Sequence, residues 1–155
     1  MQDRRLRTQT AASRPLRVER LESRELLAAF DLLLFTKTGG YRHPSIVDGI
    51  AAVETLAELH GFSVDVTDDA SVFTPTALLK YEAVLFLSTT GELLDSNQQS
   101  ALEGYMQAGG GWIGVHAAAD AEYDWPWYEG LVGAYFQNHP AIQEATVTVA
   151  DRGDV

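Results

Sequence analysis

The chain has 155 residues, of which 46% are hydrophobic, and it carries a formal net charge of -11 with no cysteine. This length allows one domain with a sizeable core and leaves little room for a second full domain. The absence of cysteine excludes disulfides, thiolate zinc sites and cysteine nucleophiles. No stretch approaches the roughly 20 apolar residues that span a bilayer, so we expect no transmembrane segment.

The charge is divided unevenly along the chain. Residues 1–30 hold seven arginines against four acidic residues, whereas residues 31–155 hold four basic residues against eighteen acidic ones. An acidic body repels nucleic acid and anionic membrane surfaces, because binding to phosphate groups needs clustered lysine and arginine. We therefore expect a small-molecule partner and no nucleic acid.

The first thirty residues differ in composition from the rest. Arginines spread among polar residues predict disorder at the start, and residues 18–29 read Val-Glu-Arg-Leu-Glu-Ser-Arg-Glu-Leu-Leu-Ala-Ala, a short amphipathic helical pattern. One interpretation is a solvated helix. The other is an export signal, since the segment resembles the LExRxLL motif of planctomycete cell-envelope and secreted proteins. That resemblance implies an extracytoplasmic location, with residues 1–30 as a targeting segment and residues 31–155 as the domain.

From residue 31 the chain alternates buried-strand and helix patterns, as repeated βαβ units do. The apolar runs predict five strands, at residues 32–36, 62–66, 83–87, 112–115 and 145–149. Helical spacing and capping residues predict helices over residues 45–60, 75–80 and 95–108, with Leu131 to Phe136 as a further helical stretch. Ser45 and Asp48 suggest a capping box, and Gly61 a helix end. The pattern predicts a parallel sheet between layers of helices.

Three polar segments each follow one of these strands directly: Lys37–His43, Ser88–Glu92 and His116–Asp120. In an open parallel sheet, ligands bind outside the carboxyl ends of the strands, where the strand order reverses. Three such loops in one short chain predict a single shared site.

The first loop contains the pair Gly39-Gly40, which allows backbone conformations closed to other residues. We expect the amides of residues 38–41 to turn inward toward a ligand, beside the cationic side chains of Lys37, Arg42 and His43. The alternative is a turn with solvated charges. The G-x-x-x-x-G-K-[ST] phosphate loop is absent, so nucleotide hydrolysis is not expected.

The third loop begins with His116 at a strand end, followed by the small residues Ala117 to Ala119. This is where α/β hydrolases hold a nucleophile, but the turn offers no serine or cysteine and so excludes acyl-enzyme chemistry. His116 can instead act as a general base or a metal ligand, with Asp120 orienting it. The alternative is a hydrogen-bonded core histidine.

Other side chains have the chemistry of a sugar site. The hydroxyls of Ser88 to Thr90 suit sugar oxygens or turn capping, and Trp125 and Tyr128 suit stacking on a sugar ring or filling the core. A divalent metal is a further alternative, held by three histidines with Asp120. The predicted catalytic residues are His116, His43 and Asp120; the predicted substrate contacts are Lys37, Gly40, Tyr41, Arg42, Ser88, Thr89, Thr90, Trp125, Tyr128 and His139.

Five stretches together resemble the ThuA-like (trehalose-utilisation) family of the class I glutamine amidotransferase-like superfamily: Phe35–His43, Asp69–Thr74, Val84–Gly91, Gly109–Asp120 and Tyr123–Tyr128. The resemblance implies a three-layer flavodoxin-like α/β fold, with His43 and His116 as pocket residues. It also implies a link to disaccharides and their 3-keto derivatives. Superfamily relatives carry a cysteine where this chain has His116-Ala117, so glutaminase activity is not expected.

The family's domain usually continues past the fifth strand, so we expect a truncated domain whose exposed apolar edge favours self-association. The leading hypothesis is a carbohydrate-metabolism protein that binds a sugar or keto-sugar at the carboxyl rim of the sheet, with its reaction type undefined. One alternative is a non-catalytic carbohydrate-binding or interaction module that uses the aromatic segment Tyr123–Tyr128. The other is a metal-dependent hydrolase.

Overall fold

A computed structural model describes residues 30–141, 143–146 and 148 of the chain. The arginine-rich start and the export-type motif at residues 18–29 lie outside the described residues. The predictions of disorder and of an extracytoplasmic location therefore stay predictions.

Four parallel strands form the main sheet, in the order β2-β1-β3-β5. They are β1 (Asp31–Phe35), β2 (Ser63–Thr67), β3 (Ala83–Leu87) and β5 (Gly111–Val115). All of β3 and nearly all of β1 are buried, as continuous apolar runs predict for strands covered on both faces. The strand order reverses between β1 and β3, so the fold has the switch point of flavodoxin-like sheets. The predicted fold class is confirmed.

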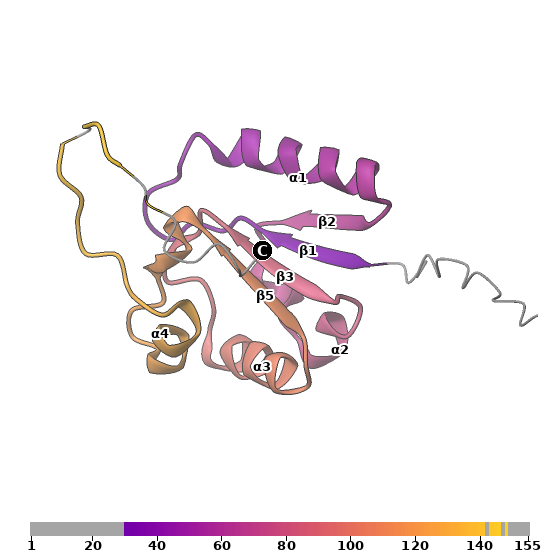
Figure 1. The fold of residues 1–155 in the computed structure, drawn as a ribbon. Coiled ribbons are helices and arrows are strands. Elements are labelled where there is room, and N and C mark those ends of the chain that lie inside the picture. The colour runs from indigo at the N-terminus through magenta and orange to yellow at the C-terminus, as the bar shows by residue number, and fades with distance from the viewer. Residues whose placement is uncertain (1–29, 142, 147, 149–155) are drawn as a thin grey trace, which may run out of the picture.

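Helices cover both faces of this sheet and make it the middle of three layers (Figure 1). α1 (Ile46–His60) lies alone on one face, while α2 (Pro75–Leu78) and α3 (Ser96–Gln107) lie on the other, joined by α4 (Pro126–Val132). Two single-turn 3-10 helices, η1 (Ala70–Val72) and η2 (His116–Ala119), follow strands β2 and β5. The larger core cluster, which includes Phe35, Phe73 and Phe86, lies on the α2–α4 face.

Helix ends follow the local sequence at most of the predicted positions. Asp95 caps α3 in a full capping box with Gln98, and Thr74 caps α2 ahead of Pro75. Gly61 ends α1 with a left-handed φ of 73°. The capping box predicted at Ser45 is wrong, because Ser45 is already in helical conformation and its side chain makes no cap bond.

The region after β5 departs most from prediction. A second, two-stranded sheet pairs β4 (Thr90–Gly91) with β6 (Asp120–Ala121) and joins two of the predicted loops. The last helix in the described part of the chain is α4, not residues 131–136, because Pro126 begins it and the left-handed Gly133 ends it. Of the strand predicted at 145–149, residues 145, 146 and 148 lie in no strand, and residues 147 and 149 lie outside the described residues.

Among the described strands, β5 is at one edge of the main sheet, and Ile113 at its centre is 44% exposed. An apolar edge strand without charged residues is open to pairing with another chain. Self-association through it stays a prediction. Among the described helices, none has both the length and the apolar character that a membrane span requires.

Candidate functional site

A cavity of about 690 Å³ opens at the carboxyl end of the main sheet. Five of the predicted site residues line it: Tyr41, His43, His116, Asp120 and His139. They come from the loop after β1, the turn after β5 and the segment after α4. The structure thus brings together side chains almost one hundred residues apart in the sequence, and the cavity size is typical of small-molecule sites.

His116 has an unusual backbone conformation. It directly follows β5 and has a φ of 52°, which L-residues with a β-carbon rarely adopt. Strain of this kind costs about 1–3 kcal/mol and concentrates at functional sites. Its ring lies 4.6 Å from the ring of His43, centroid to centroid, at 68°. Neither imidazole makes a hydrogen bond to another described residue, so both remain available to a ligand.

Thr90 positions the first loop within the cavity. Its hydroxyl donates to the carbonyl of Tyr41 at 2.9 Å, and its own carbonyl accepts the amides of Gly39 and Gly40 at 2.5 and 3.1 Å. A β-carbon on Gly39 would lie 2.7 Å from the carbonyl oxygen of Glu92. The two glycines therefore permit close packing of two loops. The prediction that their amides face a ligand is wrong, because these donors are occupied.

His43, His116 and Asp120 form the polar part of the cavity lining, which we call the floor. The carboxylate of Asp120 is partly fixed by the protein. Oδ1 accepts a hydrogen bond from the hydroxyl of Tyr123 at 2.6 Å. No described residue donates to its other oxygen. Burial and this hydrogen bond raise the pKa of Tyr123 to about 12, so its phenol keeps its hydrogen at neutral pH. Asp120 therefore has one oriented oxygen and one oxygen free to meet a ligand.

The segment after α4 forms the outer wall of the cavity, residues 134–139. It contributes Ala134, Tyr135 and Phe136 together with His139. The amide of Phe136 donates to the carbonyl of Ala119 at 2.8 Å, which fastens the wall to η2. Apart from His139, sequence reasoning missed these residues because it placed them in a helix. The left-handed Gly133 that ends α4 was the available signal for an emerging loop.

Sequence reasoning also missed Glu122, a fully buried carboxylate beside the site. Oε1 accepts the amides of Leu93 and Leu94, both at 2.7 Å, and Oε2 accepts the side-chain amide of Gln99 at 2.7 Å. These bonds fasten the end of β6 to the start of α3. Asp120, Glu122 and Asp124 look alike in the sequence, and only the fold separates the buried acid from the cavity acid.

The two basic side chains of the first loop lie elsewhere. Lys37 donates to the carbonyl of Leu93 and lines a separate hollow among acidic residues. Arg42 turns back along the loop, and its guanidinium donates to the carbonyl of Thr36 at 3.0 Å. Their predicted contact with a ligand in this cavity is corrected, because each charge is satisfied by a strand or loop carbonyl.

Six other predicted ligand contacts do not line the cavity. Gly40 packs on β4. Ser88, Thr89 and Thr90 are at most 3% exposed, because the chain stays in the protein interior after β3 ends. Trp125 and Tyr128 are 7% and 0% exposed and lie in the larger core cluster. The Trp125 indole donates to Glu103 at 2.9 Å and the Tyr128 hydroxyl to the Ala118 carbonyl at 2.8 Å. These two aromatic residues thus belong to the core next to η2 and not to the cavity lining.

The metal-site alternative requires at least three ligating side chains around one point in the cavity. Three histidines and Asp120 line the cavity, but no group of three or more His, Cys, Asp or Glu side chains in residues 30–141, 143–146 and 148 is arranged to hold a metal ion. The described side chains therefore do not fit a metal ion.

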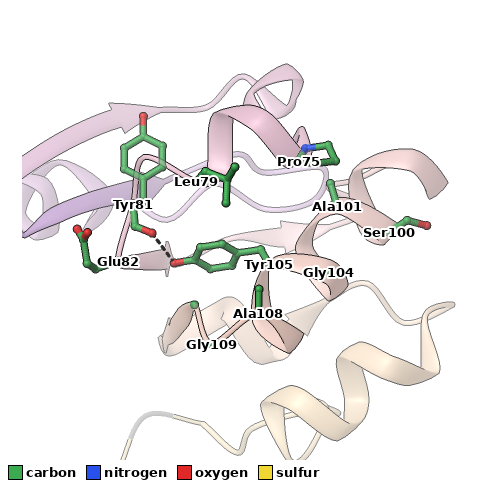
Figure 2. A pocket seen from close by; sticks show the side chains of 11 residues that line it. Pro75, Leu79, Tyr81, Glu82, Ser100, Ala101, Gly104, Tyr105, Ala108 and Gly109 are labelled. Carbon is green, nitrogen blue, oxygen red and sulfur yellow. Dashed lines mark hydrogen bonds between the residues drawn. The ribbon is translucent and has the colours of Figure 1, made fainter.

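A second cavity of about 570 Å³ opens at the opposite, amino end of the sheet, between α2 and α3 (Figure 2). The hydroxyl of Tyr105 donates to the carbonyl of Tyr81 at 3.1 Å, and Glu82 accepts the amide of Asp31 at 2.7 Å. The lining contains no histidine, and its other residues are mostly small or apolar. Its main polar groups are thus engaged in holding the fold.

Comparisons with known proteins agree with this fold. The family model described as trehalose utilisation (ThuA) matches residues 31–155. Among solved structures, a ThuA-like protein from Bacteroides uniformis is 28% identical, with a TM-score of 0.59 over 72% of this chain and 47% of that chain. The chain thus spans about half the length of that protein. None of the curated proteins compared with it matches.

Proposed function

The chain belongs to the trehalose-utilisation (ThuA) family, and on that premise we propose that its carboxyl-end cavity binds a sugar or keto-sugar. The observation that carries the proposal is the meeting of His43, His116 and Asp120 in one cavity with exposed aromatic rings. Imidazoles and a carboxylate suit the hydroxyl and carbonyl oxygens of a sugar. The protein's place in carbohydrate metabolism rests on the family's description.

The aromatic lining suits the ring of a sugar. Tyr41 is 65% exposed and Phe136 is 40% exposed, and both line the cavity beside the polar floor. An aromatic face covers the apolar C–H face of a sugar while the polar floor takes its hydroxyls. Two exposed aromatic rings in one lining, one from the first loop and one from the outer wall, thus support a cyclic ligand.

His116 is the proposed general base. Its imidazole has no partner among the described residues other than the ring contact with His43, so a lone pair is free to accept a proton from a sugar hydroxyl or from a carbon next to a keto group. His43 would stabilise the negative charge left on the ligand or donate a hydrogen bond to a ligand oxygen. Asp120, which lines the same cavity, would accept or return a proton. No serine or cysteine is present in this turn to form an acyl intermediate.

Calorimetric titration with trehalose, simple glucosides and their 3-keto forms tests this proposal. We expect binding by the wild-type chain and a loss of at least about tenfold in affinity in His116→Ala, the effect of removing about 1.4 kcal/mol. His60→Ala is the matched control, because His60 ends α1 and does not line the cavity. Unchanged affinity in His116→Ala would overturn the site assignment.

A non-catalytic carbohydrate-binding module is the second candidate, favoured by the same exposed aromatics. In this candidate function the same cavity binds the sugar, but the histidines transfer no proton. Incubation of the sugars that bind, followed by product analysis, separates the two. A recognition surface built from Trp125 and Tyr128 is not available, because both side chains are buried.

A further inference from the structure

The hydroxyl of Tyr123 joins the proposed acid–base residue to the outer wall. It lies 2.6 Å from Oδ1 of Asp120 and 2.7 Å from the carbonyl oxygen of Phe136. No other side chain among the described residues bonds to both the cavity floor and this wall. A change in the strength of one of these two hydrogen bonds therefore changes the strength of the other.

A count of hydrogens shows that the two bonds compete. A phenol hydroxyl has one hydrogen to donate, and both neighbouring oxygens are acceptors while Asp120 is ionised. The charged carboxylate is the stronger acceptor, so it takes the larger share of that hydrogen. The carbonyl of Phe136 is then left with a weak bond. When Asp120 carries a proton, its carboxyl can donate to the Tyr123 oxygen, and Tyr123 can donate fully to Phe136.

We propose that Tyr123 is a positioning residue that couples the proton on Asp120 to the seating of the outer wall. A proton gained by Asp120 strengthens the bond from Tyr123 to Phe136 and holds the wall against the cavity. Loss of that proton draws the Tyr123 hydrogen to Asp120 and loosens the wall. This inference rests on the proposed function, in which Asp120 exchanges a proton with the ligand.

The groups around Tyr123 allow it to play this part. Its ring lies 4.8 Å from that of Tyr135, which belongs to the wall. The raised pKa of about 12 keeps the Tyr123 hydrogen in place across the range in which carboxylates and imidazoles titrate. The cavity lining adds the titratable side chains of Tyr41, His43, His116, Tyr135 and His139. The charges of Glu92, Glu122, Asp124 and Glu129 act on Tyr135 in the wall.

Tyr135 provides a matched control. Its hydroxyl also fastens the wall, because its one hydrogen is shared between the carbonyls of Glu122 and Trp125, at 2.7 and 3.1 Å. Neither acceptor is a side chain, and neither gains or loses a proton. Removal of the Tyr135 hydroxyl should therefore loosen the wall equally, whatever the state of residue 120.

Hydrogen exchange of the Phe136 amide tests the coupling, because this amide is bonded to Ala119 within the wall contact. Asp120→Asn imitates the protonated state, since its amide can donate to Tyr123. We expect exchange about fivefold slower in Asp120→Asn than in the wild type, the factor for roughly one hydrogen bond. That slowing should vanish in a Tyr123→Phe background and persist in a Tyr135→Phe background.

Equal slowing by Asp120→Asn in the Tyr123→Phe background would overturn the coupling, and so would no slowing in the wild-type background. Far-ultraviolet circular dichroism confirms that each variant is folded. The measurement needs no sugar, so it can fail while sugar binding still depends on His116. Conversely, a chain that binds no sugar but shows the coupling would overturn the proposed function and leave the wall contact standing.

Discussion

The two ends of the sheet hold cavities of similar size but opposite chemistry. The carboxyl-end cavity measures about 690 Å³ and presents imidazoles without protein partners, whereas the amino-end cavity measures about 570 Å³ and has Tyr105 and Glu82 bonded to backbone groups. A hollow between helices is common, whereas a polar ligand also needs side chains around the hollow that have donors and acceptors to offer. The free polar groups, more than the volume, identify the ligand site.

The two ends also differ in backbone strain. Ser88, His116 and Glu122, the described non-glycine residues with left-handed φ, all follow the carboxyl ends of strands. In the lining of the amino-end cavity, only Gly109 has a positive φ, which costs a glycine little. Strain at one end alone fits a site whose geometry is maintained by surrounding bonds.

The largest expected effect comes from removing the support of the carboxyl end. Glu122→Ala leaves the amides of Leu93 and Leu94 and the side chain of Gln99 without their buried acceptor. We expect the free energy of unfolding to fall by about 3 kcal/mol. Urea denaturation measures it, with the exposed Glu129→Ala as control. A fall below about 1 kcal/mol would contradict the role given to Glu122.

A smaller effect is expected at the amino end. Tyr105→Phe removes the bond to the carbonyl of Tyr81 and should lower the free energy of unfolding by about 1 kcal/mol. Sugar affinity should not change, because this cavity is structural. Calorimetry on the folded variant checks this. Loss of sugar binding in Tyr105→Phe would break the distinction drawn between the two ends.

Relief of strain should stabilise the carboxyl end while removing its function. His116→Gly adopts a φ of 52° without the steric cost that a β-carbon adds, so we expect the free energy of unfolding to rise by up to about 1 kcal/mol. His116→Ala keeps the β-carbon and is the matched control. Greater stability in the alanine variant than in the glycine variant would show that the strain lies elsewhere.

Alkaline pH gives the smallest and most diagnostic effect. The folded-state pKa of Tyr123 is raised to about 12, above that of an unfolded tyrosine, so its contribution to stability is complete below about pH 10 and is lost as the pH rises toward 12. Tyr81 adds a loss of the same sign at the amino end. We expect Tyr123→Phe to flatten this decline in part, as followed by denaturation at each pH. A decline unaffected by Tyr123→Phe would contradict the assignment.

Periodicity and capping residues predicted the main sheet and its long helices because those signals are local. The αL glycine after α1 and the Asp95 cap of α3 are examples. Tyr41, His43, His116 and Asp120 lie together in one cavity because strand ends converge on one rim, and His139 joins them from the segment after α4. The burial of Ser88, Trp125 and Tyr128 could not be predicted from the sequence, because it depends on packing against distant segments. The position of Phe136 in the cavity lining was not predicted, because the composition of its loop does not distinguish the loop from a helix.

Histidine signals in two-dimensional NMR provide the most direct test of the central claim, because three of the four histidines line the carboxyl-end cavity and one does not. His43, His116 and His139 line the carboxyl-end cavity, and His60 does not. On titration with trehalose or its 3-keto form, the account predicts that the three cavity imidazoles shift while His60 stays constant. Shifts confined to His60, or none in His43 and His116 at a concentration where calorimetry records binding, would contradict it.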